Sequence, residues 1–350
     1  MEPAHPLEPG SPHGAQEKPL LEVRHLSKQF PVGNLLKTRF VHAVEDVSFS
    51  VQRGKVVAIV GESGSGKSTT VRLIARLMPA TAGEIYFQGN NVLKSEPHGV
   101  SLAYRRKVQM IFQDPFSSLN AVHTVRHHLE RPLSIHHTAG AAGSARSRLD
   151  GRIDELLATV GLNPPEEYAC RYPHQLSGGQ RQRVAIARAL AVNPELILAD
   201  EPISMLDVSI RIGILNLMQQ LKEANGISFV YITHDLASAR YIGDQIMVMY
   251  AGHMVEGGDS EEIMRSPGHP YTQLLLSAVP DPRAGLRTQR DIGSRGEVPV
   301  LIDPPPGCPF TARCPKVTDV CRHVMPGETR LGPGHWVRCH LYGEKKRVDL

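Results

Sequence analysis

The strongest constraint on the fold comes from a glycine-rich stretch, GESGSGKST at residues 61–69. An unbroken and mostly β-branched apolar run at residues 56–60 precedes it, as is typical of a buried parallel strand. Apolar residues then recur at helical spacing between Val71 and Met78. A strand, a glycine-rich turn and a helix in this order form a phosphate-binding loop, because glycines let successive backbone N–H groups point at one anion and the helix N-terminus adds partial positive charge. The sequence therefore predicts a nucleoside triphosphate site.

Most residues of this loop receive a predicted role. We expect Lys67 to reach the β- and γ-phosphates and the Ser68 hydroxyl to bind Mg²⁺. A glycine-rich turn without a ligand is the alternative, and the position of the motif between a strand and a helix argues against it. The predicted nucleotide-binding residues of the loop are Gly61, Ser63, Gly64, Ser65, Gly66, Lys67, Ser68 and Thr69.

A second chemical feature is a pair of carboxylates, Asp200 and Glu201, at the end of an apolar run. Residues 196–199 are all apolar, which predicts a buried strand that delivers both carboxylates at its C-terminal end. Open parallel sheets bind their ligands at that edge. We expect Asp200 to hold Mg²⁺ through its water shell and Glu201 to orient and polarise the attacking water. Two surface carboxylates at a strand end would be the alternative.

Composition and charge exclude several classes of protein. Lys and Arg total 39 against 35 for Asp and Glu, which gives no electrostatic reason to expect a nucleic-acid partner. The longest wholly apolar runs have about six residues, whereas a membrane-spanning helix needs roughly 20. Residues 1–20 contain Pro, Gly, His and acidic residues without an apolar core, so no signal peptide is expected. The chain should therefore stay in the cytosol, where disulfides are rare.

The pentapeptide LSGGQ at residues 176–180 opens another predicted helix. It comes after the phosphate-binding loop and just before the acidic strand. In this order the three features resemble the ATP-binding subunits of ABC transporters. The resemblance implies that Ser177, Gly178, Gly179 and Gln180 bind the nucleotide held by an opposite subunit. Since the sequence contains a single phosphate-binding loop, the chain is expected to pair with a second ATPase chain, either another copy or a related protein.

Three more residues match functional positions of that family. His234 follows a third buried strand and matches the switch histidine that contacts the γ-phosphate. Gln113 matches the Q-loop, which touches the metal and water region and lies beside the surface that docks on the membrane partner. Phe30 best matches the aromatic residue that stacks on adenine, but Phe40 competes with it because residues 31–39 look like an insertion. The resemblance thus names Glu201, His234 and Gln113 as catalytic residues and Ser68, Gln113 and Asp200 as the Mg²⁺ site.

The C-terminal part narrows the resemblance. Residues 267–275 resemble the segment that follows the core in the oligopeptide/dipeptide subfamily. Four cysteines then occur within a segment that has too little apolar mass to form a core unaided. Four thiolates suit a 4Fe–4S cluster or a structural Zn²⁺, and the resemblance implies iron–sulfur because some members of the subfamily carry it; thiols without any metal are the remaining alternative. The predicted ligands are Cys308, Cys314, Cys321 and Cys339.

Together these features predict an α/β fold of the P-loop NTPase type, with a mostly parallel sheet, an antiparallel β subdomain, a helical insertion that carries LSGGQ, and a small cysteine-rich C-terminal extension. A disordered tail is expected at residues 1–19, because this segment is rich in Pro, Gly and charge and poor in apolar residues. The nucleotide-binding domain is expected at 20–265, with its helical subdomain at about 104–190, and the extension at 266–350.

The resemblance also implies a function. A member of this family is the ATP-hydrolysing motor of an importer for peptides or a related solute, with ATP and Mg²⁺ as cofactors. It works with a second ATPase subunit, two transmembrane permease subunits and an extracytoplasmic solute-binding protein, and it is peripheral on the cytoplasmic face of the cell membrane. A soluble ABC ATPase of DNA repair or translation is the alternative, although such proteins commonly carry long coiled coils or two phosphate-binding loops. A nucleotide kinase would leave LSGGQ and His234 unexplained.

Overall fold

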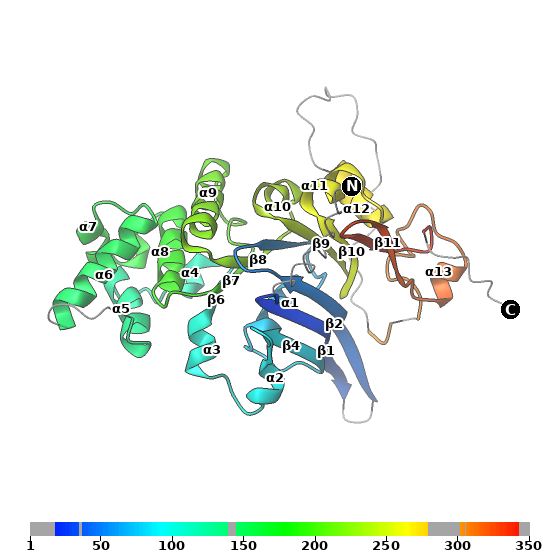
Figure 1. Cartoon of the computed structure of the whole chain (residues 1–350), viewed down its shortest axis with the longest axis horizontal. Coiled ribbons are helices and arrows are strands. Elements are labelled where there is room, and N and C mark those ends of the chain that lie inside the picture. The colour runs from blue at the N-terminus through cyan, green and yellow to red at the C-terminus, as the bar shows by residue number, and fades with distance from the viewer. Residues whose placement is uncertain (1–17, 35–36, 139–144, 279–301, 305, 343–350) are drawn as a thin grey trace, which may run out of the picture.

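The computed structural model describes residues 18–34, 37–138, 145–278, 302–304 and 306–342 (Figure 1). Two sheets and the helices around them make up this part of the chain. Most of the predicted tail at residues 1–19 lies outside the described residues, and so do residues 279–301, 305 and 343–350 of the predicted extension.

The larger sheet has the strand order β11-β12-β10-β9-β3-β8-β7-β6. Its strands from β9 to β6 run parallel, as the continuous apolar runs predicted. Strand β10 pairs antiparallel with β9 through the turn at Ala251 and Gly252, and β12 and β11 continue the sheet in antiparallel fashion. The strands are β3 (Val56–Val60), β6 (Val108–Ile111), β7 (Leu196–Asp200), β8 (Ser228–Thr233), β9 (Gln245–Tyr250), β10 (His253–Asp259), β11 (Glu328–Gly332) and β12 (His335–Arg338).

The smaller sheet is antiparallel and has the order β2-β1-β4-β5. Together with α1 it covers one face of the larger sheet. The alternation of side chains along β3 separates the two faces. Val57 and Ile59 pack in the cluster that contains the smaller sheet, whereas Val56, Ala58 and Val60 belong to the cluster on the opposite face. The strands are β1 (Leu21–Asn34), β2 (Lys37–Val51), β4 (Ala82–Phe87) and β5 (Asn90–Asn91).

A cluster of helices lies beside β6 and β7, at the left of Figure 1. Its helix α6 is amphipathic, and the side chains of Ile153, Leu156 and Leu157 on its apolar face are buried. The predicted helical subdomain at about 104–190 also includes β6, which is a strand of the larger sheet, so the helical cluster itself begins with α4. Helix α3 (Leu102–Lys107) precedes β6, and the cluster contains α4 (Pro115–Ser118), α5 (Val125–Ile135), α6 (Ala145–Thr159), α7 (Pro165–Cys170), the 3₁₀ helix η1 (Pro173–Gln175) and α8 (Gly178–Leu190).

Helices α8, α9 and α10 bury their apolar residues on the face of the larger sheet that carries Val56 and Ala58. Within the described ranges, no helix combines the length and the apolar character needed to cross a membrane. The helices outside the cluster are α1 (Lys67–Ile74), α2 (Val92–Ser95), α9 (Val208–Asn225), α10 (Leu236–Ile242), α11 (Ser260–Arg265), α12 (Pro270–Ser277) and α13 (Val320–His323).

The C-terminal extension is joined to the core through a strand, which corrects the prediction of a small cysteine-rich extension with too little apolar mass to form a core unaided. Strand β12 pairs with β10. The fully buried Glu256 of β10 accepts hydrogen bonds from the backbone N–H groups of residues 268–269 at 2.6 and 2.9 Å, and it pairs with Nε2 of His335 at 2.8 Å. Phe310, which is 1% exposed, packs edge-on against Tyr250 with ring centroids 5.1 Å apart. The extension therefore shares the core of β9 and β10.

Candidate functional site

The phosphate-binding loop joins β3 to α1 at the carboxyl end of the parallel strands. Gly64 and Gly66 have φ angles of +80° and +103°, in the left-handed region that favours glycine. A Cβ on Gly66 would lie 2.3 Å from the carbonyl oxygen of Ala43, and a Cβ on Gly61 would lie 2.2 Å from that of Met249. The loop is thus packed closely between β2 and β9, so a side chain at either position would displace it.

Lys67 begins α1 and is only 4% exposed. Its Nζ donates to the carbonyl oxygens of Gly61 at 2.7 Å and Glu62 at 2.8 Å. Burial lowers the pKa of Lys67, and the nearby carboxylates of Glu201 and Asp200 oppose this effect. The ammonium group is therefore held at the loop, where it can bind the phosphates of a nucleotide.

Ser68 and Asp200 form the part of the site that can hold Mg²⁺. The Oγ atom of Ser68 donates to Oδ1 of Asp200 at 2.7 Å, and Arg72 Nη2 lies 4.0 Å from the other carboxylate oxygen. Asp200 is 1% exposed, and burial raises its pKa although the hydrogen bond from Ser68 lowers it. Hydroxyl and carboxylate oxygens are ligands that Mg²⁺ prefers, so these two side chains fit the predicted metal site.

Glu201 is the meeting point of three loops. The Nε2 atom of Gln113 donates to its Oε2 at 3.2 Å, and Nδ1 of His234 lies 3.2 Å from the same oxygen. Gln113 follows β6, Glu201 follows β7 and His234 follows β8, so adjacent parallel strands bring the three side chains together. Glu201 has a φ angle of +44°, which is uncommon for a residue with a side chain and is typical of functional sites.

The LSGGQ residues lie in another part of the molecule. Ser177 caps α8: its Oγ accepts from the N–H of Gln180 at 3.3 Å, and its own N–H donates to Oε1 of Gln180 at 2.9 Å. A Cβ on Gly179 would lie 2.5 Å from Cγ2 of Ile210 on α9, so a larger residue there would require the Ile210 side chain to shift. Figure 1 shows α8 inside the helical cluster and α1 near the middle of the molecule. The motif is thus preorganised by its own helix, away from the loop of the same chain.

The two aromatic residues considered for adenine stacking occupy neighbouring strands. Phe30 of β1 pairs with Val41 of β2, and Phe40 pairs with Pro31. Because directly paired residues point to the same face, Phe30 and Phe40 point to opposite faces of this hairpin. Phe30 is half-buried with Nζ of Lys28 5.0 Å from its ring centroid, whereas Phe40 is 41% exposed. The assignment of Phe30 to the adenine stays a prediction.

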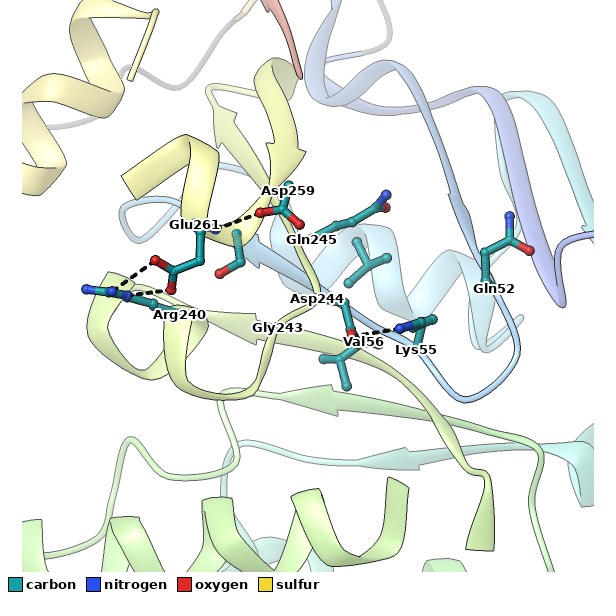
Figure 2. A pocket seen from close by; sticks show the side chains of 11 residues that line it. Gln52, Lys55, Val56, Arg240, Gly243, Asp244, Gln245, Asp259 and Glu261 are labelled. Atoms are coloured by element: carbon teal, nitrogen blue, oxygen red, sulfur yellow. Dashed lines mark hydrogen bonds and ion pairs between the residues drawn. The ribbon is translucent and has the colours of Figure 1, made fainter. Parts of the chain in front are cut away.

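A pocket of about 390 Å³ lies at the opposite edge of the sheet (Figure 2). It is lined by the first residues of β3 and β9, whereas the predicted site residues lie at the carboxyl ends of the strands. Four of its charged groups form two ion pairs. Arg240 forms two bonds of 2.9 and 3.0 Å with Glu261, and Lys55 lies 3.2 Å from Asp244. This pocket therefore contains none of the predicted nucleotide-binding residues.

The prediction of an iron–sulfur or zinc site at the four cysteines is wrong. Cys308, Cys314, Cys321 and Cys339 line one small cavity beside Phe310. In the described residues, however, no group of three or more His, Cys, Asp or Glu side chains could hold a metal ion. Burial raises the pKa of the Cys308 thiol to about 12 and also raises those of Cys314 and Cys339, which favours the neutral thiols. These residues therefore fit neither the 4Fe–4S cluster nor Zn²⁺.

The sequence did not predict a role for three residues around the phosphate-binding loop. Glu62 lies inside the motif, and its partners are Arg313 of the extension and Tyr271 of α12. No local pattern could have found them, because Arg313 lies 251 positions and Tyr271 lies 209 positions away from Glu62.

Comparison with known proteins identifies the family. A family model for "ABC transporter" matches residues 44–204, and one for "Oligopeptide/dipeptide transporter, C-terminal region" matches residues 255–321. The oligopeptide transport ATP-binding protein AppF of Bacillus subtilis is 44% identical over 332 residues, which are 94% of this chain and 99% of AppF. The chain belongs to the ABC transporter family.

Two further comparisons agree with an ABC ATP-binding protein. The dipeptide transport ATP-binding protein DppF of Escherichia coli is 44% identical over 92% of this chain and 94% of DppF. A dimeric post-hydrolysis structure of the ATP-binding cassette MJ0796 with ADP and Pi has a TM-score of 0.58 and 32% identity, and covers 69% of this chain and 98% of that chain. The predicted α/β ABC ATPase fold and ATPase activity are thus confirmed. A soluble ABC ATPase is not favoured, because the C-terminal region also matches the transporter family.

Proposed function

We propose that this ABC ATPase binds MgATP at the loop between β3 and α1 and hydrolyses it with Glu201. The observation that carries this proposal is the contact of Gln113 and His234 with one oxygen of Glu201, at 3.2 Å from each. This carboxylate directly follows Asp200, whose partner Ser68 stands at the start of the loop helix. A carboxylate beside a Mg²⁺ site at the carboxyl end of a parallel sheet is where an attacking water has to be held.

The proposed roles follow from what ATP hydrolysis requires. The reaction needs a positioned water and stabilisation of the charge that develops on the transferred phosphoryl group. Glu201 accepts a hydrogen bond from the water and polarises it, while Gln113 and His234 hold its carboxylate in place. Lys67 and the loop amides bind the phosphates, and Mg²⁺ held at Ser68 and Asp200 supplies further positive charge.

The LSGGQ motif serves the nucleotide of a second ATPase chain in this proposal. Ser177 is exposed at the N-terminus of α8, a helix of 13 residues, and a helix N-terminus favours anions. Since α8 lies apart from α1 within one chain, the γ-phosphate that Ser177, Gly178, Gly179 and Gln180 contact is that of a partner (Figure 1). The partner is another copy or a related ATPase.

We further propose a role in the import of peptides or a related solute. AppF and DppF are named as oligopeptide and dipeptide transport ATP-binding proteins. The chain then works with two permease subunits and an extracytoplasmic solute-binding protein, and it is peripheral on the cytoplasmic face of the membrane. The separate family matches at 44–204 and 255–321 support a nucleotide-binding domain at 20–265 and an extension at 266–350.

Affinity purification from the native host tests this proposal. The chain carries an N-terminal tag, and detergent-solubilised complexes are isolated with and without ATP. Recovery of two multi-span membrane proteins and a second ATPase supports the transporter, and a co-purified binding protein then offers its ligand for identification. Recovery of this chain alone in every nucleotide state would overturn the transporter assignment.

A further inference from the structure

The C-terminal extension contacts the phosphate-binding loop through a charged pair. Nη1 of Arg313 donates to Oε2 of Glu62 at 2.6 Å, and Nη2 donates to Oε1 at 2.9 Å. The Arg313 side chain is 8% exposed and the Glu62 side chain 33%. Two parallel, charge-assisted hydrogen bonds of this kind are strong and directional. The extension therefore holds the second residue of the loop in a defined orientation.

The backbone of Glu62 is held as well. Its N–H donates to the hydroxyl oxygen of Tyr271 at 2.9 Å, and Tyr271 is fully buried on α12. Its carbonyl oxygen accepts from Nζ of Lys67 at 2.8 Å and from the N–H of Ser65 at 3.2 Å. Glu62 thus connects the extension and α12 with Lys67, the residue proposed to bind the phosphates. A change at Arg313 can therefore reach Lys67 through one residue.

Charge explains why this glutamate needs a partner. A carboxylate inside a phosphate-binding loop repels an anionic ligand. Glu62 is also close enough to Lys67 for its negative charge to raise the pKa of the lysine, against the lowering effect of burial. The hydrogen bonds to Glu62 raise the pKa of Arg313, which keeps the guanidinium charged. The guanidinium carbon also lies 5.7 Å from the ring centroid of Tyr250 and 5.9 Å from that of Phe310, so two buried rings hold the arginine in position.

We propose that Arg313 is a positioning residue of the ATP site, which neutralises and orients Glu62 and thereby sets the affinity of the loop for MgATP. This inference rests on the proposed function, since it requires the loop to bind ATP. It gives the C-terminal extension a role in nucleotide binding.

The test measures the dissociation constant of MgATP by isothermal titration calorimetry on the full chain. Arg313→Gln should raise it about tenfold, because Glu62 is left as an unpaired carboxylate beside the phosphates. The double variant Glu62→Gln/Arg313→Gln should return it to within about threefold of the wild-type value, because the repelling charge is gone. In ATPase assays with the partner ATPase, KM should rise together with the dissociation constant while kcat changes little. The reason is that Arg313 acts through Glu62 and has no proposed contact with the water or the transferred phosphoryl group.

Arg338→Gln is the matched control. Arg338 also belongs to the extension and pairs with a carboxylate of the core, Asp46 at 3.3 Å, but not with the loop. Its variant should bind MgATP like the wild type. An Arg313→Gln protein that loses thermal stability but binds MgATP normally would overturn the inference, and so would a double variant as weak as the single one. A wild-type chain that binds no MgATP would instead overturn the proposed function, and this inference with it.

A second pair of variants leaves Arg313 intact in case Arg313→Gln does not fold. Glu62→Asp keeps the negative charge but is too short to keep both bonds, whereas Glu62→Gln removes the charge. Glu62→Asp should therefore bind MgATP more weakly than Glu62→Gln. The reverse order would show that the charge of Glu62 does not control affinity.

Discussion

Ser68 and Asp200 are joined by a hydrogen bond of 2.7 Å, although 132 positions separate them in the sequence. Ser68 stands in the first turn of α1 and Asp200 ends β7. Strand β8 lies between β7 and β3, so the two residues meet only when all three strands are assembled in this order. The candidate Mg²⁺ site is therefore created by the strand order of the larger sheet.

The first prediction concerns the carboxylate that contacts Gln113 and His234. Glu201→Gln should bind MgATP with near wild-type affinity but hydrolyse it about 10²–10³-fold more slowly, because an amide is a far weaker base than a carboxylate. The amide has nearly the same shape, so the contacts at 3.2 Å need little adjustment. Phosphate release and ATP binding are measured on the same preparation. Near-normal hydrolysis by this variant would show that Glu201 does not polarise the attacking water.

The second prediction compares two glycines with positive φ angles. Gly66→Ala should cost about 2–4 kcal/mol of stability and abolish ATP binding, because its Cβ would lie 2.3 Å from the carbonyl oxygen of Ala43. Gly54→Ala also has a positive φ angle, of +64°, but no atom would lie within 4 Å of its Cβ, so it should cost only about 1 kcal/mol. Urea unfolding of both variants measures the difference. Equal losses would contradict the close packing of the loop.

The third prediction separates capping from partner binding at LSGGQ. Ser177→Ala should cost about 1 kcal/mol of stability, because it removes the cap of α8. It should also abolish the ATP-dependent association of a Glu201→Gln chain with its partner ATPase, measured by size-exclusion chromatography. Thr124→Ala is the control, since it removes the cap of α5 in the same helical cluster and should leave association intact. Association that survives Ser177→Ala would argue against a shared nucleotide site.

The fourth prediction concerns stability at acidic pH. Burial lowers the pKa of His269 to about 4 from an ordinary value of 6.5, and its Nδ1 accepts the N–H of Tyr271 at 3.0 Å. Between these two values the unfolded chain binds more protons than the folded one. The free energy of unfolding should therefore fall as the pH drops from 6.5 to 4, by at most about 3 kcal/mol from this residue.

His269→Asn keeps an acceptor for the helix N-terminus and removes the titration, so stability should depend less on pH between 4 and 6.5. Some dependence should remain, because burial also lowers the pKa of His253 to about 4. Urea unfolding at several pH values measures the slope. His98→Asn, at an exposed position, should keep the wild-type slope. A His269→Asn slope as steep as that of the wild type would refute the idea that His269 is buried without charge.

The prediction for the cysteines failed for a physical reason. Their spacing in the sequence indicates how many thiols are near one another in the chain, but not where each side chain points or whether it ionises. The folded chain places Cys308 against the core beside Phe310, where burial favours the neutral thiol. The sequence also did not decide between Phe30 and Phe40, because it does not show the register of β1 and β2. That register places the two rings on opposite faces of one hairpin.

The amino-acid sequence alone was sufficient to predict the elements and loops that are formed by continuous segments of the chain. The apolar run at 56–60 forms β3, and the run before Asp200 forms β7. The loop between β3 and α1 has glycines where its backbone requires positive φ angles. These features were predictable because they depend on local periodicity and on local backbone conformation. The contact of Gln113 with Glu201 and that of Arg313 with Glu62 came only from the assembled fold. Such contacts depend on strand order and on how distant segments pack, and neither leaves a local pattern in the chain.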